Sequence, residues 1–293
     1  FIANPDCSGV IFTRTFNSHS PYYVINYDKS GKTNLVTSGK DNPSMKTLVI
    51  FKNKINNQIF FGNNLKILPL IEKSFNNDRL DIEFCIKKNL FYLLQCRPLK
   101  KVKKIDDKFV EPTLVNIEKK IKKLNQPIHN LEGKSNCFSN MSDWNPAEMI
   151  GVRPSMLALS LYSELITDEV WSRQRSDYGY KDVRPNPLMI SFGGAPYIDL
   201  RVDFNSFLPS KLPLKIQKKA IEFYLKKIKK KPELHDKIEF DVVETCYDFN
   251  THTRLSEFLN KKEIKIYSKY LKEILNKILD SKNSILKKEM QKV

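Results

Sequence analysis

Four polar residues in the string LDIEFCIKKNLFYLLQCRP, residues 80–98, have types and spacing that suit a cation and a phosphate. Asp81 and Glu83 are two residues apart, and so are Gln95 and Arg97. On extended chain, residues two apart point to the same side of a sheet. Carboxylate and amide oxygens are ligands that Mg²⁺ prefers, and a guanidinium grips phosphate oxygens in pairs. The spacing therefore predicts a face suited to a magnesium nucleotide.

A turn in the KKN stretch has to bring the two pairs together. A register centred on Asn89 sets Asp81 opposite Arg97 and Glu83 opposite Gln95. The plain alternative is an antiparallel hairpin with an ordinary Asp81–Arg97 ion pair and solvated neighbours. In either case the same register places six side chains on the opposite, apolar face: Ile82, Phe84, Ile86, Tyr92, Leu94 and Cys96.

This hairpin resembles the last two strands of the ATP-grasp nucleotide-binding domain of pyruvate phosphate dikinase and phosphoenolpyruvate synthase. Those enzymes carry a similar D-I-E-[FW]…L-Q-x-R-P string. The resemblance implies that Glu83 and Gln95, with Asp81 nearby, hold Mg²⁺ and the ATP phosphates, and that Arg97 contacts phosphate. The implied cofactors are thus ATP and Mg²⁺.

The resemblance extends upstream over residues 1–100. CSGVIFTR, which ends at Arg14, is similar to the family's SGV-x-F-[TS]-R strand, and this implies that Arg14 also binds the nucleotide. LVTSG, residues 35–39, is similar to a family strand that ends in V-x-G. Apolar residues in helical spacing predict a helix over Lys66 to Phe75, where the family has one before the hairpin.

Two stretches depart from the family pattern. After Arg14 the family usually has Asp-Pro and a Thr-Gly turn, whereas this chain has Thr15 to His19. Asn34 replaces a glutamate that precedes the V-x-G strand, and Asp28 is a substitute carboxylate from a different position. These departures support a second hypothesis, in which the nucleotide-binding part is a non-catalytic sensor or scaffold and residues 136–293 are an interaction module.

Length and composition predict an α+β fold with two domains. We expect a partial ATP-grasp antiparallel sheet with helices over residues 1–100, a charged linker and helix over 101–135, and a mainly helical α+β domain over 136–293. No apolar run approaches the length of a membrane span. The five cysteines have no C-x-x-C spacing, which indicates free thiols and a cytoplasmic location.

The formal charge of +17 raises a third hypothesis, nucleic-acid binding. Most basic residues are lysines spread along the whole chain with many Asn and Ile residues, which indicates compositional bias rather than a binding patch. The chain has neither a recognisable DNA-binding motif nor alternating aromatic and basic residues. We therefore do not expect a nucleic-acid partner.

Five of the arginines lie in one segment, between Arg153 and Arg201, near the turn-rich strings SDWNPAEMIGVRP and FGGAPYIDLR. They could grip an anionic substrate, or they could cap helices and pair with Asp143, Glu148 or Asp182. SDWNPAEMIG resembles segments that follow the ATP-binding part of phosphoenolpyruvate synthase-like proteins. Local patterns predict strands over 188–192, 197–202 and 238–247, and helices over 116–124, 156–166, 214–230 and 262–288.

The resemblance implies a fragment of an ATP-dependent phosphotransferase. The chain opens without Met inside a strand region, so we expect an internal piece of a longer protein. No catalytic residue is expected in this piece. The implied partners are the nucleotide and the phosphohistidine and pyruvate-binding domains of the same protein, where a histidine accepts the phosphoryl group.

Overall fold

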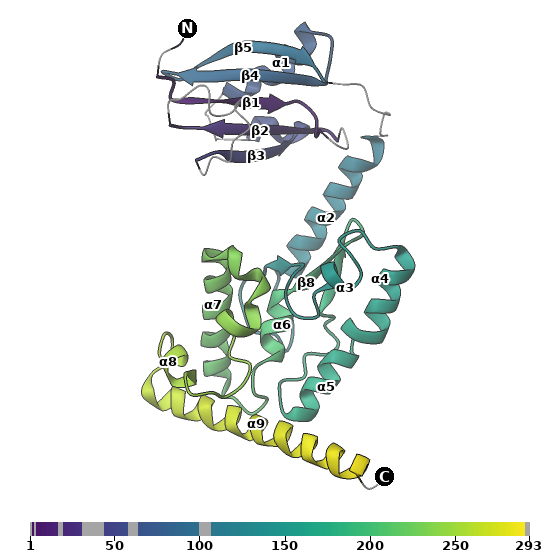
Figure 1. Cartoon of the computed structure of the whole chain (residues 1–293), viewed down its shortest axis with the longest axis vertical. Coiled ribbons are helices and arrows are strands. Elements are labelled where there is room, and N and C mark those ends of the chain that lie inside the picture. Colours follow the sequence, from purple (N-terminus) through teal and green to yellow (C-terminus); the bar gives the residue numbers. More distant parts are fainter. Residues whose placement is uncertain are drawn as a thin grey trace. The chain divides into compact units, whose positions relative to one another are not determined.

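The structure is a computed structural model that describes residues 2, 4–16, 20–30, 44–57, 64–99 and 107–290, without the side chains of 281–290. The chain divides into two compact units, Phe1–Pro112 and Thr113–Val293 (Figure 1). The dividing point falls within the range 101–135 that we expected to be linker. Each unit is described by itself.

The first unit is built on a five-stranded antiparallel sheet with the order β3-β2-β1-β4-β5. Helix α1 (Leu68–Ser74) covers one face of the sheet, and its Leu68 and Ile71 belong to the core there. This helix confirms the prediction over Lys66 to Phe75, although a 3-10 turn (Asn64–Ile67) forms its start. The strands are β1 (Cys7–Phe12), β2 (Tyr22–Asp28), β3 (Lys46–Phe51), β4 (Leu80–Lys87) and β5 (Leu90–Pro98).

A two-residue turn joins β4 to β5. Lys88 and Asn89 have φ angles of 48° and 63°, and Lys87 pairs with Leu90 around them. Positive φ at both central residues is the geometry of a type I′ turn, whose twist matches that of antiparallel strands. The turn thus forms where the sequence predicted it.

The predicted hairpin register holds for Asp81 and Glu83 but not for the residues between Glu83 and the turn. Between Glu83 and Phe84 the pairing shifts by one residue, so Phe84 lies opposite Leu93 instead of Leu94. Such a bulge inserts one extra residue and reverses which side chains face the core beyond it.

The prediction of which β5 side chains face the core was therefore wrong for two residues. Tyr92 and Leu94 are exposed, at 37% and 50%, and are not core residues. Phe91 takes the inward position and stacks on Phe84, with ring centroids 5.3 Å apart. Cys96, which lies before the bulge, packs against the core as expected.

The second unit is mainly helical, with a small antiparallel sheet of order β6-β8-β7. A turn at Gly193 and Gly194, both with positive φ, joins β7 to β8, as expected for a plain hairpin. The strands are β6 (Phe138–Ser139), β7 (Met189–Phe192) and β8 (Ala195–Asp199). The helices are α2 (Val110–Leu124), α3 (Pro146–Met149), α4 (Met156–Tyr162), α5 (Val170–Tyr178), α6 (Leu200–Ser206), α7 (Leu214–Lys230), α8 (Thr251–Leu255) and α9 (Lys261–Met290).

One of the predicted strands is right only in its first half, and another is wrong. The strand expected over 197–202 ends at Asp199, because the Asp199 carboxylate accepts a hydrogen bond from Val202 N at 3.0 Å and caps α6. The strand expected over 238–247 is a π-helical turn, Ile238–Val242. Its Ile238 and Val242 are buried, so the apolar run serves the core without pairing in a sheet.

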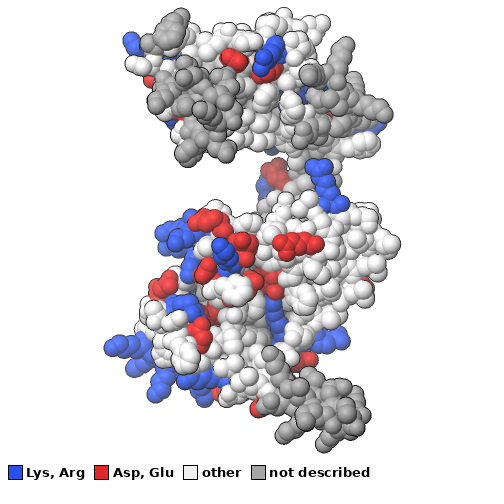
Figure 2. Space-filling model, in the orientation of Figure 1, with Lys and Arg blue, Asp and Glu red and all other residues white. Residues whose placement is uncertain are grey.

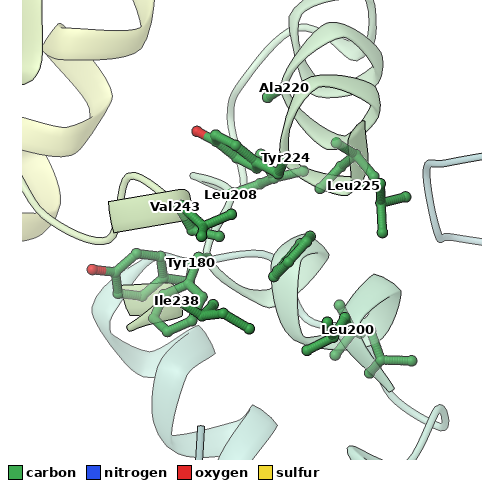
Figure 3. Close-up of a cluster of buried hydrophobic side chains, with 14 of the residues drawn as sticks. Tyr180, Leu200, Leu208, Ala220, Tyr224, Leu225, Ile238 and Val243 are labelled. Carbon is green, nitrogen blue, oxygen red and sulfur yellow. The ribbon is translucent and has the colours of Figure 1, made fainter. Parts of the chain in front are cut away.

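The core of the second unit lies between α6, α7 and α9. Figure 3 shows part of it, including the buried side chains of Leu200, Tyr224 and Ile238. Helix α9, predicted over 262–288, contributes Tyr267 and Leu271, both completely buried. In the described part of the chain, none of the helices has the length and apolarity to cross a membrane.

Candidate functional site

The four polar residues of the hairpin lie on one face of β4 and β5. Asp81 pairs with Arg97 and Glu83 pairs with Gln95, which confirms the predicted register at these positions. Arg97 Nε donates a hydrogen bond to Asp81 Oδ2 at 2.7 Å. This ion pair raises the pKa of Arg97, chiefly through the hydrogen bond from its guanidinium to the Asp81 carboxylate.

Several oxygen acceptors on this face have no partner. Asp81 Oδ1 is buried and makes no hydrogen bond with the described residues. Within the same ranges, the side chains of Glu83 and Gln95 form neither hydrogen bonds nor ion pairs. A buried carboxylate oxygen without a partner is costly, so this oxygen is suited to accept from a donor or a cation other than the described residues.

A polar row continues across the sheet from this hairpin. Glu83 lies beside Val10 of β1, Val10 lies beside Asn26 of β2, and Asn26 lies beside Thr47 of β3. Thr47 Oγ1 donates to Asn26 Oδ1 at 2.7 Å. The sequence analysis missed Asn26 and Thr47; the signal that could have found Asn26 is a polar residue inside the otherwise apolar strand YYVINYD.

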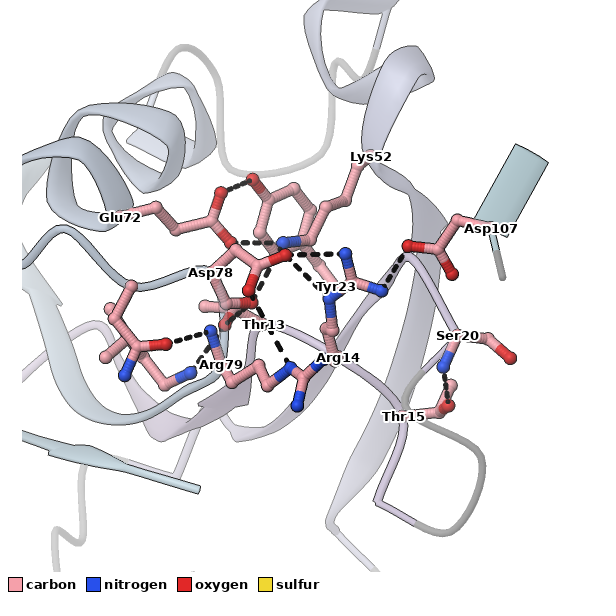
Figure 4. Close-up of polar contacts among 12 residues, drawn as sticks. Thr13, Arg14, Thr15, Ser20, Tyr23, Lys52, Glu72, Asp78, Arg79 and Asp107 are labelled. Atoms are coloured by element: carbon pink, nitrogen blue, oxygen red, sulfur yellow. Dashed lines mark hydrogen bonds and ion pairs between the residues drawn. The ribbon is translucent and has the colours of Figure 1, made fainter. Parts of the chain in front are cut away.

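Arg14, the fifth predicted nucleotide ligand, is not free to act as one. Its guanidinium donates from Nε to Asp78 Oδ2 at 2.9 Å and from Nη1 to Asp107 Oδ2 at 2.6 Å (Figure 4). The pKa of Arg14 is raised: burial lowers it, but the two carboxylates raise it by more. The structure thus places Arg14 in an ion-pair cluster of its own.

The same cluster fixes the end of β4. Thr13 Oγ1 donates to the carbonyl of Asp78 at 2.9 Å and accepts from Leu80 N at 2.7 Å. Lys52 and Tyr23 both donate to the carboxylate of Glu72. Burial lowers the pKa of Lys52 although Glu72 opposes this shift. These contacts position the strand that carries Asp81.

The departures from the family pattern are only partly visible. Thr15 closes a loop, because its Oγ1 accepts from Ser20 N at 2.8 Å, but residues 17–19 lie outside the described residues, as do Asn34 and the strand expected over 35–39. Asp28, the substitute carboxylate, is buried at the end of β2 and accepts hydrogen bonds from Ser30 N and Ser44 Oγ.

Four of the five arginines between Arg153 and Arg201 bind acidic side chains or backbone carbonyls. Arg175 pairs with Asp143 and Asp203, and Arg184 pairs with Asp182. Two of these acidic partners were among those predicted, whereas Glu148 is not a partner of any described arginine. Pairing and capping thus account for four of these five arginines, and Arg153 is exposed without a partner among the described residues.

Charge and apolar side chains are distributed unevenly on the second unit. Figure 2 shows acidic and basic side chains interspersed on one face, whereas the surface over α3 and α4 is mostly uncharged. Large apolar side chains are exposed there, including Met156 at 74% and Leu157 at 68%. The apolar helix predicted after Ser155 thus exists, but part of its apolar surface faces solvent.

The described ranges contain no group of three or more His, Cys, Asp or Glu side chains that could hold a metal ion unaided. Mg²⁺ commonly uses one or two protein carboxylates and takes its remaining ligands from water and nucleotide phosphates. The two carboxylates and the amide of the hairpin fit that pattern. A scan against models of known protein families gives no match, and a search of curated proteins also gives none.

Proposed function

We propose that the hairpin face of the first unit binds Mg-ATP and that the chain is part of an ATP-dependent phosphotransferase similar to pyruvate phosphate dikinase and phosphoenolpyruvate synthase. The observation that carries the proposal is the set of unpartnered acceptors on one face, above all the buried Asp81 Oδ1. The order of β1, α1 and the β4–β5 hairpin along the chain supports an ATP-grasp assignment, because the resemblance implies these three in that order.

Each residue of the face has a role in this proposal. Asp81, Glu83 and Gln95 would provide oxygens for Mg²⁺, which would supply positive charge to offset the negative charge of the ATP phosphates. Arg97 uses Nε for Asp81, so its two terminal nitrogens are available to a phosphate oxygen. The phosphohistidine and pyruvate-binding domains of the same protein are the proposed partners, and the acceptor is a histidine in the former.

The proposal is tested by calorimetric titration of the chain with Mg-ATP. Replacing Glu83 by Gln removes one charge and keeps the shape of the side chain, so we expect affinity to fall at least tenfold. Glu118→Gln, which alters an exposed carboxylate on α2, is the matched control and should leave affinity unchanged. If the parent chain does not bind Mg-ATP, or Glu83→Gln binds equally well, the hairpin is an ordinary structural element.

A non-catalytic nucleotide sensor is the second candidate. The observation that favours it is the engagement of Arg14 by Asp78 and Asp107, which removes one cation that the resemblance assigns to the nucleotide. Acid-labile phosphate on a histidine of the full-length protein after incubation with Mg-ATP supports the transferase. Mg-ATP binding without that product supports the sensor.

A further inference from the structure

The second unit contains a pocket that the proposed function does not use. Its volume is about 280 Å³, and it lies between β6, β8, the end of α7 and the short 3-10 helix Pro232–Asp236. Cys137, Asn140 and Tyr197 contribute to its walls. A volume near 300 Å³ is at the lower end of the usual range for small-molecule sites.

The walls combine apolar surface with basic groups. Phe138, Leu200 and Pro232 provide apolar surface, and Lys229 and His235 provide nitrogen groups. None of the described residues that line the pocket is acidic. A site with an apolar wall, a lysine ammonium and an imidazole but no carboxylate is complementary to an organic anion.

Lys229 is fixed at the pocket without being neutralised. Its Nζ donates to Ser135 Oγ at 2.7 Å, and no carboxylate in the described ranges forms an ion pair with it. Lys219 on the same helix differs, because its Nζ lies 2.7 Å from Glu263 Oε1. The hydroxyl of Ser135 orients the Lys229 ammonium but leaves its charge available to a ligand.

Hydrogen bonds hold the segments that line the pocket in place. Asn136 Nδ2 donates to the buried Asp199 carboxylate at 2.8 Å, and Leu200 N donates to the Cys137 carbonyl at 3.0 Å. Lining residues on β6 and at the start of α6 are thus connected by backbone and side-chain hydrogen bonds. A wall fixed in this way loses little conformational entropy when a ligand binds.

We propose that this pocket binds a small organic anion, with a compact apolar ring against Phe138, Leu200 and Pro232 and a carboxylate or phosphate group at Lys229 and His235. The site is independent of the hairpin face, and its test does not depend on ATP. The two anionic groups share the same recognition chemistry, so probes of both kinds are needed.

The affinity test uses four probes on the full chain: benzoate, phenyl phosphate, inorganic phosphate and the neutral benzyl alcohol. We expect saturable binding of benzoate or phenyl phosphate, weakened about tenfold by Lys229→Gln, which corresponds to about 1.4 kcal/mol. Lys226→Gln, on an exposed lysine of α7 that does not line the pocket, should have no effect. The better of the two anions identifies the preferred head group.

Location is tested by cysteine alkylation. Cys137 lines the pocket, whereas Cys246 is comparably exposed and does not line it. The bound anion should slow alkylation of Cys137 at least threefold and leave Cys246 unchanged, as measured by peptide mass spectrometry. The proposal is wrong if neither organic anion binds, if Lys226→Gln and Lys229→Gln act equally, if inorganic phosphate protects Cys137 as well as phenyl phosphate, or if Cys137 is not selectively protected.

Discussion

Asp81 and Arg97 form an ion pair across β4 and β5 that satisfies only half of the carboxylate. Arg97 Nε lies 2.7 Å from Asp81 Oδ2, while Asp81 Oδ1 is buried without a partner among the described residues. An ordinary surface pair would leave both oxygens to water. The unpartnered Oδ1 of Asp81 is the observation that favours cation binding over an ordinary structural hairpin.

If the hairpin face binds Mg-ATP as proposed, removal of Mg²⁺ should weaken nucleotide binding there. Without the cation, the carboxylates of Asp81 and Glu83 face the negatively charged phosphates, and like charges repel. We expect the affinity for ATP to fall at least tenfold in EDTA and to return when Mg²⁺ is restored, as measured by calorimetry. Equal affinity with and without Mg²⁺ would contradict the assignment of these carboxylates.

Gly9 is required where β1 passes between β2 and β4. A Cβ at this position would lie 2.2 Å from the carbonyl oxygen of Asn26 and 2.9 Å from Phe84 Cε1, so the strands would have to move apart. We expect Gly9→Ala to destabilise the first unit by about 3 kcal/mol. Leu70→Ala, on the exposed side of α1, should change stability by less than about 0.5 kcal/mol.

Hydrogen exchange read by mass spectrometry measures this effect in each unit separately. Gly9→Ala should accelerate exchange in β1 and β4 and leave α7 unchanged. Both tryptophans, Trp144 and Trp171, belong to the second unit, so their fluorescence reports unfolding of that unit alone. If Gly9→Ala instead destabilises the second unit, as read by fluorescence, as much as it destabilises β1, as read by hydrogen exchange, the two units unfold together and this prediction is wrong.

Arg201 holds the segment that follows α2. Its side chain is completely buried and donates to the carbonyls of Leu124 at 2.6 Å and Gln126 at 3.0 Å. Burial lowers the pKa of Arg201 and Asp199 partly opposes this shift. Arg201→Met leaves those carbonyls without donors, and we expect a loss of about 3 kcal/mol.

Urea unfolding followed by tryptophan fluorescence measures the Arg201 effect in the second unit. Arg153→Met is the matched control, because Arg153 is exposed and should cost less than about 0.5 kcal/mol. Similar losses for the two variants would mean that the Arg201 hydrogen bonds contribute little.

Asp182 should titrate at unusually low pH. The hydrogen bond from the Arg184 guanidinium is the largest cause that lowers its pKa to about 2, and Ser172 contributes. Because the folded-state pKa lies below the unfolded value, this carboxylate stabilises the protein above about pH 4 and loses that contribution as pH falls toward 2. Solvent screening keeps the effect on stability small, because the side chain is 41% exposed.

NMR titration of the Asp182 carboxyl group checks this shift. Arg184→Gln should move the pKa up toward the ordinary value for aspartate. Arg173→Gln, which removes an arginine paired with Glu169, should leave it where it is. An unchanged pKa in Arg184→Gln would show that another group causes the shift.

Local sequence was enough to predict the features that depend on neighbouring residues. The period of two in β4 and β5 and the turn at Lys88 and Asn89 predicted the register at Asp81 and Glu83. Helical spacing predicted α7 over its full length and nearly all of α9. In these cases side-chain period and turn geometry act within a few residues, so a single sequence contains the information.

Tertiary contacts decided what the local pattern could not. The bulge after Glu83 moved Phe91 into the core in place of Tyr92 and Leu94, and a carboxylate at Asp199 ended a strand that its apolar residues would have continued. The carboxylates that pair with Arg14, those of Asp78 and Asp107, are 64 and 93 residues away in the sequence. A buried charge is stabilised by the oppositely charged groups that lie near it in the folded protein. Which carboxylates lie near Arg14 depends on how the sheet packs and not on spacing along the chain.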